Sequence, residues 1–168
     1  HATQMEPRET AAMSATGAVA GLCPITEANL GDGFFDALRF RGPWGVGSDS
    51  NVEITAPGEL RLLEYGQRLL HRGRNLLARG EGRSTGEDLW TAALQGGAQA
   101  CGIATPALAP GAHADIAWLA GTPDEAIFAA ADVTRVMAAG RVVVEEGRHA
   151  RRDAIAARFR RVLDRLRG

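Results

Sequence analysis

Asp49 is the residue whose position in the sequence most directly suggests chemistry. It follows a short apolar run at residues 44–47 that has the length of a strand. In parallel α/β sheets and barrels, functional side chains gather at the carboxyl ends of the strands. A carboxylate at such an end can bind a hard or borderline cation, or shuttle a proton to bound water. An aspartate can also form an Asx-turn or cap a helix, so this segment alone leaves both interpretations open.

A second group of polar residues follows an earlier apolar run. The loop that we expect at residues 26–33 carries Thr26, Glu27, Asn29 and Asp32, which could reach a substrate. Turn formation explains Asn29 and Asp32 equally well. The histidines at positions 71, 113 and 149 lack ligand spacing, and a histidine at position 1 has no significance by itself. The sequence contains neither an HxH nor an HExxH motif, so spacing alone leaves the function undetermined.

The elements that would position these residues alternate between helices and strands. The apolar run at residues 18–23 does not alternate with polar residues, which favours a strand buried on both faces of a parallel sheet. A second, shorter apolar run follows at residues 44–47. Helices are predicted at residues 7–15 and 59–72, and a third begins after Ser84, which has capping-box spacing to Glu87. This order of elements is typical of an α/β fold.

The pattern changes after residue 110. Residues 115–119, 133–137 and 141–144 have the composition of strands, and the last two are expected to pair as a hairpin. An amphipathic helix is predicted at residues 153–166, with its apolar residues on one stripe and its arginines on a solvated face.

Composition limits the classes of protein that remain. The chain has 168 residues, is 45% hydrophobic and carries a formal net charge of -1. These values argue against disorder, a nucleic-acid platform and an anionic-membrane binder. Two distant cysteines make a disulfide framework or a structural zinc site improbable and indicate a reducing, cytoplasmic setting. The first residue is a histidine, so we expect the chain to begin inside a longer protein.

Four segments of the sequence, each taken as a whole, are more characteristic of a protein family than their individual residues are. They are HATQ at residues 1–4, GAVAGLCPITEANLGDG at 17–33, GSDS at 47–50 and ELRLLEYGQRL at 59–69. Together they closely resemble the formimidoylglutamate deiminases of the metal-dependent amidohydrolase superfamily. Later features, including the hairpin region at residues 133–147, are similar to the end of proteins of that superfamily.

The resemblance implies an α/β fold, the C-terminal part of a TIM-like (β/α)₈ barrel with strands of a small β-sandwich. A barrel of this kind takes about 250 residues, so this chain would be an incomplete C-terminal piece. Residues 1–109 would run from the end of the sixth barrel strand to the eighth helix. Residues 110–150 would supply β-sandwich strands and the hairpin, and residues 151–168 a C-terminal amphipathic helix.

The resemblance also implies roles for a few residues. Asp49 would ligate one divalent metal, zinc or alternatively iron, and take a proton from the attacking water. His1 would polarise the reacting centre, while Thr26, Asn29 and Ser50 would contact the substrate. The implied reaction is hydrolysis of N-formimino-L-glutamate to N-formyl-L-glutamate and ammonia, in a cytoplasmic homodimer without nucleic-acid or membrane partners. The piece alone would be inactive, because the remaining ligands would precede His1.

Other functions remain open at this point. The family commonly has histidine at the positions of Gln4 and Asn51, which leaves fine specificity in doubt. One alternative is another deaminase or hydrolase of the superfamily, such as a guanine or cytosine deaminase or an imidazolonepropionase. A second alternative, from a different class, is a non-catalytic remnant that binds no metal.

Overall fold

The computed structural model describes residues 1–104 and 107–168 as a mixture of helices and strands. The chain divides into two compact units. The first contains His1–Ala112 and Gly121–Ala131, and the second contains His113–Ala120 and Asp132–Gly168. Within the described residues, no helix combines the length and apolar character needed to cross a membrane.

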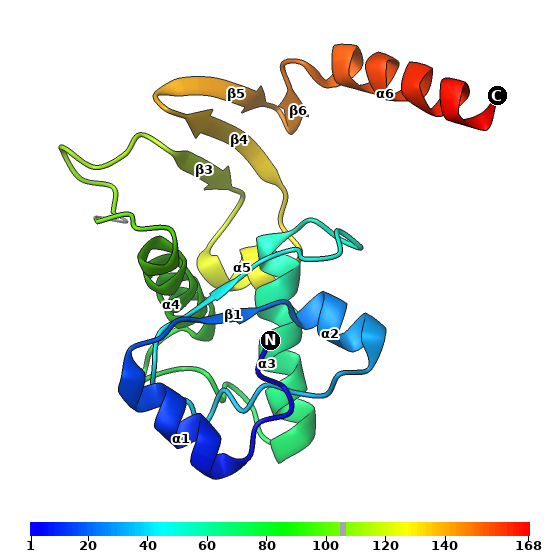
Figure 1. The fold of residues 1–168 in the computed structure, drawn as a ribbon. Coiled ribbons are helices and arrows are strands. Elements are labelled where there is room, and N and C mark those ends of the chain that lie inside the picture. Colours follow the sequence, from blue (N-terminus) through cyan, green and yellow to red (C-terminus); the bar gives the residue numbers. More distant parts are fainter. Residues whose placement is uncertain (105–106) are drawn as a thin grey trace. The chain divides into compact units, whose positions relative to one another are not determined.

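The first unit is built around two short parallel strands (Figure 1). Its elements are α1 (Pro7–Thr16), β1 (Ala20–Leu22), α2 (Pro24–Leu30), β2 (Trp44–Val46), α3 (Ala56–His71), α4 (Thr85–Ala100) and α5 (Pro123–Phe128). The strands pair in register, with Ala20 opposite Trp44 and Leu22 opposite Val46. Helix α4 packs against β2, and α5 contacts both α3 and α4. The α/β class expected from the sequence is therefore present.

Several helix boundaries follow directly from local chemistry. Ser84 caps α4 by accepting a hydrogen bond from the backbone N–H of Glu87 at 3.0 Å, which confirms the predicted start of that helix. Proline occupies the first turn of α1, and Gly17 ends this helix with a left-handed φ of 73°. These boundaries were visible in the sequence because each depends on neighbouring residues only.

Two expectations about the first unit are wrong. The segment at residues 26–33 is not a loop, because α2 starts at Pro24 and continues to Leu30 before Gly31 ends it with a φ of 73°. Pro24 ends the strand and also suits the first helical turn, where its missing N–H costs nothing. Strand β1 is also not buried on both faces, since Gly21 between its two buried neighbours is exposed.

The core of the first unit joins both strands to the helices. Its fully buried apolar side chains are those of Leu22, Phe40, Leu60, Leu89 and Ile127. The backbone of α4 lies very close to that of β2, because a Cβ on Gly96 would be 2.0 Å from the carbonyl oxygen of Trp44. The absence of a side chain at Gly96 therefore lets the helix backbone rest directly on β2.

The second unit is an antiparallel sheet followed by a helix. Strands β3 (Ile116–Leu119), β4 (Val133–Ala138), β5 (Arg141–Glu145) and β6 (Arg148–His149) lie in sequence order. The predicted hairpin is confirmed, because β4 and β5 pair from Ala138 opposite Arg141. Helix α6 (Arg152–Arg167) is also confirmed, and its apolar side chains are exposed or only partly buried.

One buried carboxylate holds the segment that follows α3, and its removal should destabilise the fold. Glu64 is 0% exposed and accepts hydrogen bonds from the backbone N–H groups of Leu76 and Leu77, each at 3.0 Å. It also pairs with Arg68, whose Nε lies 2.7 Å from its carboxylate oxygen. We expect Glu64→Ala to lower the free energy of unfolding by about 3 kcal/mol, because buried donors lose their acceptor.

Urea denaturation of this variant against Glu81→Ala measures the effect. Glu81 is exposed in the same connecting region, so its truncation should change the unfolding free energy by less than about 0.5 kcal/mol. Equal stability of the two variants would show that the hydrogen bonds of Glu64 contribute little.

Candidate functional site

Three potential ligand residues converge at one end of the parallel strands. One ligand atom each of His1, Cys23 and Asp49 lies within 4.8 Å of the other two. Cys23 directly follows β1, and Asp49 lies in the turn after β2. Because the strands are parallel, their carboxyl ends bring these two residues to the same edge. His1 reaches this edge from the segment before α1.

The turn after β2 fixes the position of Asp49. The backbone N–H of Asn51 donates to the carbonyl of Ser48 at 2.9 Å, and the Ser48 hydroxyl donates to the Asn51 side chain at 3.0 Å. Asp49 and Asn51 both have left-handed backbones, with φ values of 41° and 54°. Aspartate and asparagine tolerate this conformation better than most residues. Asp49 itself is exposed, and the Ser50 hydroxyl donates to its carboxylate at 3.3 Å.

The three residues proposed from the resemblance as substrate contacts occupy different environments. Thr26 is only 1% exposed, and its hydroxyl accepts from the backbone N–H of Ser50 at 3.4 Å. Thr26 therefore connects α2 to the turn that carries Asp49. Ser50 is exposed beside Asp49, whereas Asn29 is exposed on α2. The structure thus groups Thr26 and Ser50 with Asp49, and places Asn29 on the outer surface of the helix.

Glu27 connects the ligand residues to α2. Its Oε1 atom lies 3.2 Å from Nδ1 of His1 and accepts the backbone N–H of Cys23 at 2.8 Å. Burial raises the pKa of the Glu27 carboxyl, although the hydrogen bond from Cys23 acts in the opposite direction. Glu27 is therefore a buried acid in direct contact with His1.

The surroundings of the site are electronegative. Burial raises the pKa of the Cys23 thiol, and the nearby Asp49 and Glu27 carboxylates raise it further. Burial likewise raises the pKa of Glu59, whose Oε2 accepts the backbone N–H of Ile25 at 2.8 Å. The other oxygen of Glu59 is buried without a hydrogen-bond partner among the described residues. This concentration of acidic groups favours a cation or a hydrogen-bond donor at the site.

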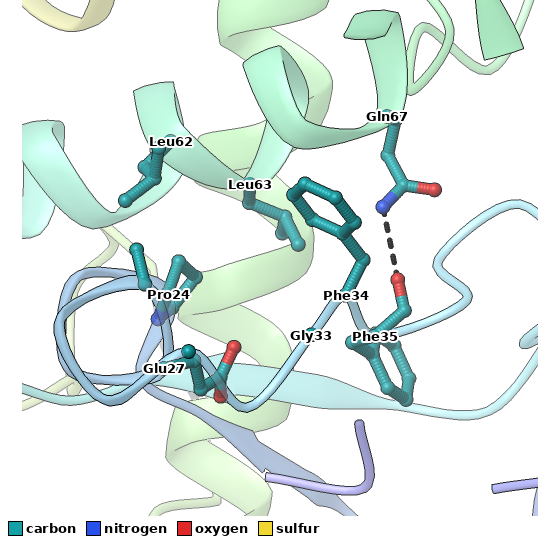
Figure 2. Close-up of a pocket in the computed structure, with 10 residues that line it drawn as sticks. Pro24, Glu27, Gly33, Phe34, Phe35, Leu62, Leu63 and Gln67 are labelled. Atoms are coloured by element: carbon teal, nitrogen blue, oxygen red, sulfur yellow. Dashed lines mark hydrogen bonds between the residues drawn. The ribbon is translucent and has the colours of Figure 1, made fainter. Parts of the chain in front are cut away.

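A cavity of about 330 Å³ borders the site on the side of α2 and α3. Figure 2 shows Leu62 and Leu63 of α3 facing Pro24 and Phe34, with Glu27 in the same wall. At one end Gln67 donates to the backbone carbonyl of Phe35 at 2.9 Å. Glu27 thus separates a largely apolar cavity from the ligand residues.

Sequence reasoning did not select Cys23, and it considered Glu27 only as one of four loop residues that could reach a substrate. Cys23 ends a strand, so the rule that selected Asp49 could also have selected it. The contact of Glu27 with His1 could not be predicted in the same way, because it joins residues 26 positions apart. Of the two positions at which the family commonly has histidine, Gln4 donates to the carbonyl of Asp32 and Asn51 closes the turn beside Asp49.

The site combines an imidazole, a thiol and a carboxylate around one point. These donor types suit a borderline divalent cation, and the carboxylate and imidazole are also the groups that move protons near neutral pH. The arrangement can therefore support metal binding and acid–base chemistry on a small substrate.

Comparison with known proteins identifies the relatives of this chain. No protein-family model matches it. Formimidoylglutamate deiminase from Pseudomonas aeruginosa is 48% identical over an alignment of 183 positions, which takes in 99% of this chain and 40% of that protein. The crystal structure of an amidohydrolase from Brucella melitensis is 47% identical with a TM-score of 0.92, over 100% of this chain and 40% of that one.

A more distant structure shows the same fold. An adenosine deaminase from Xanthomonas campestris with bound zinc is 22% identical and has a TM-score of 0.83, over 99% of this chain and 42% of its own. The chain spans about two fifths of the length of each of these proteins. The resemblance stated from the sequence is thereby confirmed: over nearly its whole length the chain is similar to part of a formimidoylglutamate deiminase, and it has the fold of the matching part of an amidohydrolase.

Proposed function

We propose that this chain forms part of the active site of a metal-dependent deiminase that hydrolyses N-formimino-L-glutamate to N-formyl-L-glutamate and ammonia. The observation that carries the proposal is the convergence of His1 and Asp49 at the carboxyl ends of β1 and β2. The 48% identity of the chain to a formimidoylglutamate deiminase also supports this proposal.

The architecture that goes with this function is a (β/α)₈ barrel with a small β-sandwich. In this proposal β1 and β2 are the last two barrel strands, and the antiparallel strands of the second unit belong to the sandwich. The remaining barrel strands, with the other metal ligands and the groups that bind the substrate carboxylates, lie outside this chain. The parallel pairing of β1 with β2 and the TM-score of 0.92 to an amidohydrolase support this arrangement.

The donor set fits a divalent metal, and zinc is the metal that we propose. The Asp49 carboxylate suits zinc as a ligand, and potential ligand atoms of His1 and Cys23 lie within 4.8 Å of it and of one another. Asp49 would hold the metal together with ligands outside this chain. When bound, such a cation lowers the pKa of water toward about 7 and polarises the reacting group.

The residues of this chain would handle protons and charge. The Asp49 carboxylate takes up the proton that the attacking water loses, and protonation of the substrate nitrogen allows ammonia to leave. His1 orients the water and stabilises the charge of the tetrahedral intermediate. Ser50 is exposed beside Asp49 and would contact the substrate, and the buried Thr26 supports it by accepting the Ser50 backbone N–H. Asn29, which is exposed on α2, is the third proposed substrate contact.

A substrate panel tests this proposal. The full-length, zinc-loaded protein that contains this chain is offered formiminoglutamate, guanine, cytosine and imidazolonepropionate in parallel, and product formation is followed for each. We expect formiminoglutamate to be turned over fastest, with release of ammonia. Faster turnover of any of the other three would overturn the substrate assignment. Equal background rates with all four would favour the non-catalytic alternative.

A further inference from the structure

We propose that Glu27 is a positioning residue for His1, which it holds in one orientation and one protonation pattern at the reacting centre. This inference rests on the proposed function, because it assigns a supporting residue to the same site. It starts from the contact between His1 Nδ1 and Glu27 Oε1 at 3.2 Å, which joins the segment before α1 to the first turn of α2.

The hydrogen bonds of Glu27 determine which atom carries the proton. Its Oε1 already accepts the backbone N–H of Cys23 at 2.8 Å. A carboxylate oxygen in that role accepts from a second partner as well, so Nδ1 of His1 is the donor. A donor at Nδ1 leaves Nε2 as the ring nitrogen that faces away from Glu27. In the neutral ring Nε2 can accept a hydrogen bond from water, and in the protonated ring it can donate one to a developing charge.

The position of Glu27 is itself well determined. Its side chain is 5% exposed, compared with 45% for that of His1, so packing constrains the carboxylate more than the imidazole. The backbone N–H of Glu27 bonds to the carbonyl of Cys23 at 2.9 Å, while its carboxylate bonds to the Cys23 N–H. These paired bonds anchor the carboxylate at the start of α2, directly after β1. Orientation of a functional histidine through its other ring nitrogen is a common device at metal sites.

Capping of α2 is the simpler role that Glu27 could have. The bond to the Cys23 N–H would stabilise the start of the helix, but it does not require a contact with His1. The two roles differ in what they predict. Loss of a cap lowers stability alone, whereas loss of a positioning residue also changes the ring of His1 and the turnover number.

Two substitutions of similar size separate the roles. Glu27→Gln keeps an oxygen acceptor for both donors, and Glu27→Met fills the same volume without an acceptor. In the full-length, zinc-loaded enzyme we expect Glu27→Met to lower kcat on formiminoglutamate by about 10- to 100-fold, with KM changed by less than about threefold. Glu27→Gln should restore kcat to within about threefold of the unaltered enzyme. If Glu27→Met does not fold, Glu27→Ala takes its place.

Glu59 provides a matched control for the helix start. Like Glu27, it is a buried acid that accepts a backbone N–H at the start of α2, in this case that of Ile25 at 2.8 Å. Glu59→Met should therefore lower the melting temperature to a similar extent. Its effect on the His1 ring should be absent, because the described hydrogen bonds of Glu59 do not include His1.

Nitrogen NMR of the histidine rings gives a readout that does not depend on activity. The His1 signals are assigned in ¹⁵N-histidine-labelled protein by their loss in His1→Ala. We expect a protonated Nδ1 in the unaltered protein and in Glu27→Gln and Glu59→Met, and an Nε2-protonated ring in Glu27→Met. An unchanged His1 ring in Glu27→Met, or a kcat within about twofold of the unaltered enzyme, would overturn the positioning role. If the unaltered protein does not hydrolyse formiminoglutamate, the proposed function fails, and the ring signals alone decide the role of Glu27.

Discussion

Asp49→Asn is expected to lower turnover of formiminoglutamate by at least about 10³-fold in the full-length enzyme. The carboxylate would serve both as a metal ligand and as the acceptor of the water proton, and the amide performs neither role well. Asparagine tolerates the left-handed backbone found at this position, where φ is 41°, so the turn should survive the substitution. The loss is therefore expected in chemistry and metal content, with little change in melting temperature.

Steady-state ammonia release and elemental analysis of the purified variant measure the two effects. Asp164→Asn is the control, since it makes the same chemical change at an exposed position of α6. Its turnover should stay within about twofold of the unaltered enzyme. Turnover of Asp49→Asn within about tenfold of the unaltered enzyme would remove Asp49 from the proposed mechanism.

Gly96→Ala is expected to destabilise the protein by more than about 4 kcal/mol, although it adds a single methyl group. The new Cβ would lie 2.0 Å from the carbonyl oxygen and 2.4 Å from the carbonyl carbon of Trp44. Both atoms belong to the backbone of β2, whose pairing with β1 leaves it little freedom to move. Because no side-chain rotation relieves the contact, α4 must separate from the strand.

The adjacent Gly97 offers the matched control. A Cβ at Gly97 has no atom within 4 Å, so Gly97→Ala meets no steric barrier. Alanine also favours a helix by about 1 kcal/mol over glycine, which predicts equal or higher stability. Thermal unfolding followed by circular dichroism compares the two variants. A Gly96→Ala protein that melts within about 3 °C of Gly97→Ala would show that the strand and helix can separate at low cost.

The elements that the sequence predicted are those with local signals. The cap at Ser84, the hairpin between β4 and β5 and the amphipathic pattern of α6 all depend on residues close together in the chain. Helix α2 was mistaken for a loop because its polar residues and the glycines after Leu30 also suit a turn. Helix α5 was not predicted, since its six residues are too few for periodicity to show. Its capping box at Thr122 and Glu125, with Pro123 in the first turn, could have indicated it.

The candidate site was predictable in part for a related reason. Asp49 could be selected because it follows a strand, whereas His1 was selected only through resemblance to a family. Its contact with Glu27 spans 26 positions and requires the fold to be known. Side chains brought together over such distances follow no local pattern, so sequence spacing cannot reveal them.

The closed turn at residues 48–51 has a consequence for the entropy of ligand binding. Its backbone and side-chain bonds between Ser48 and Asn51 are formed within the chain itself, before any ligand arrives. Fixing the backbone of one residue costs about 1–2 kcal/mol of conformational entropy. For the residues on both sides of Asp49 this entropy is lost when the chain folds, and not when a ligand binds. A ligand therefore meets a carboxylate that is preorganised, and its affinity is not reduced by the need to arrange the loop. Natural variation at position 51 should accordingly be limited to residues that accept a left-handed backbone, because any other residue would return the ordering cost to the binding step.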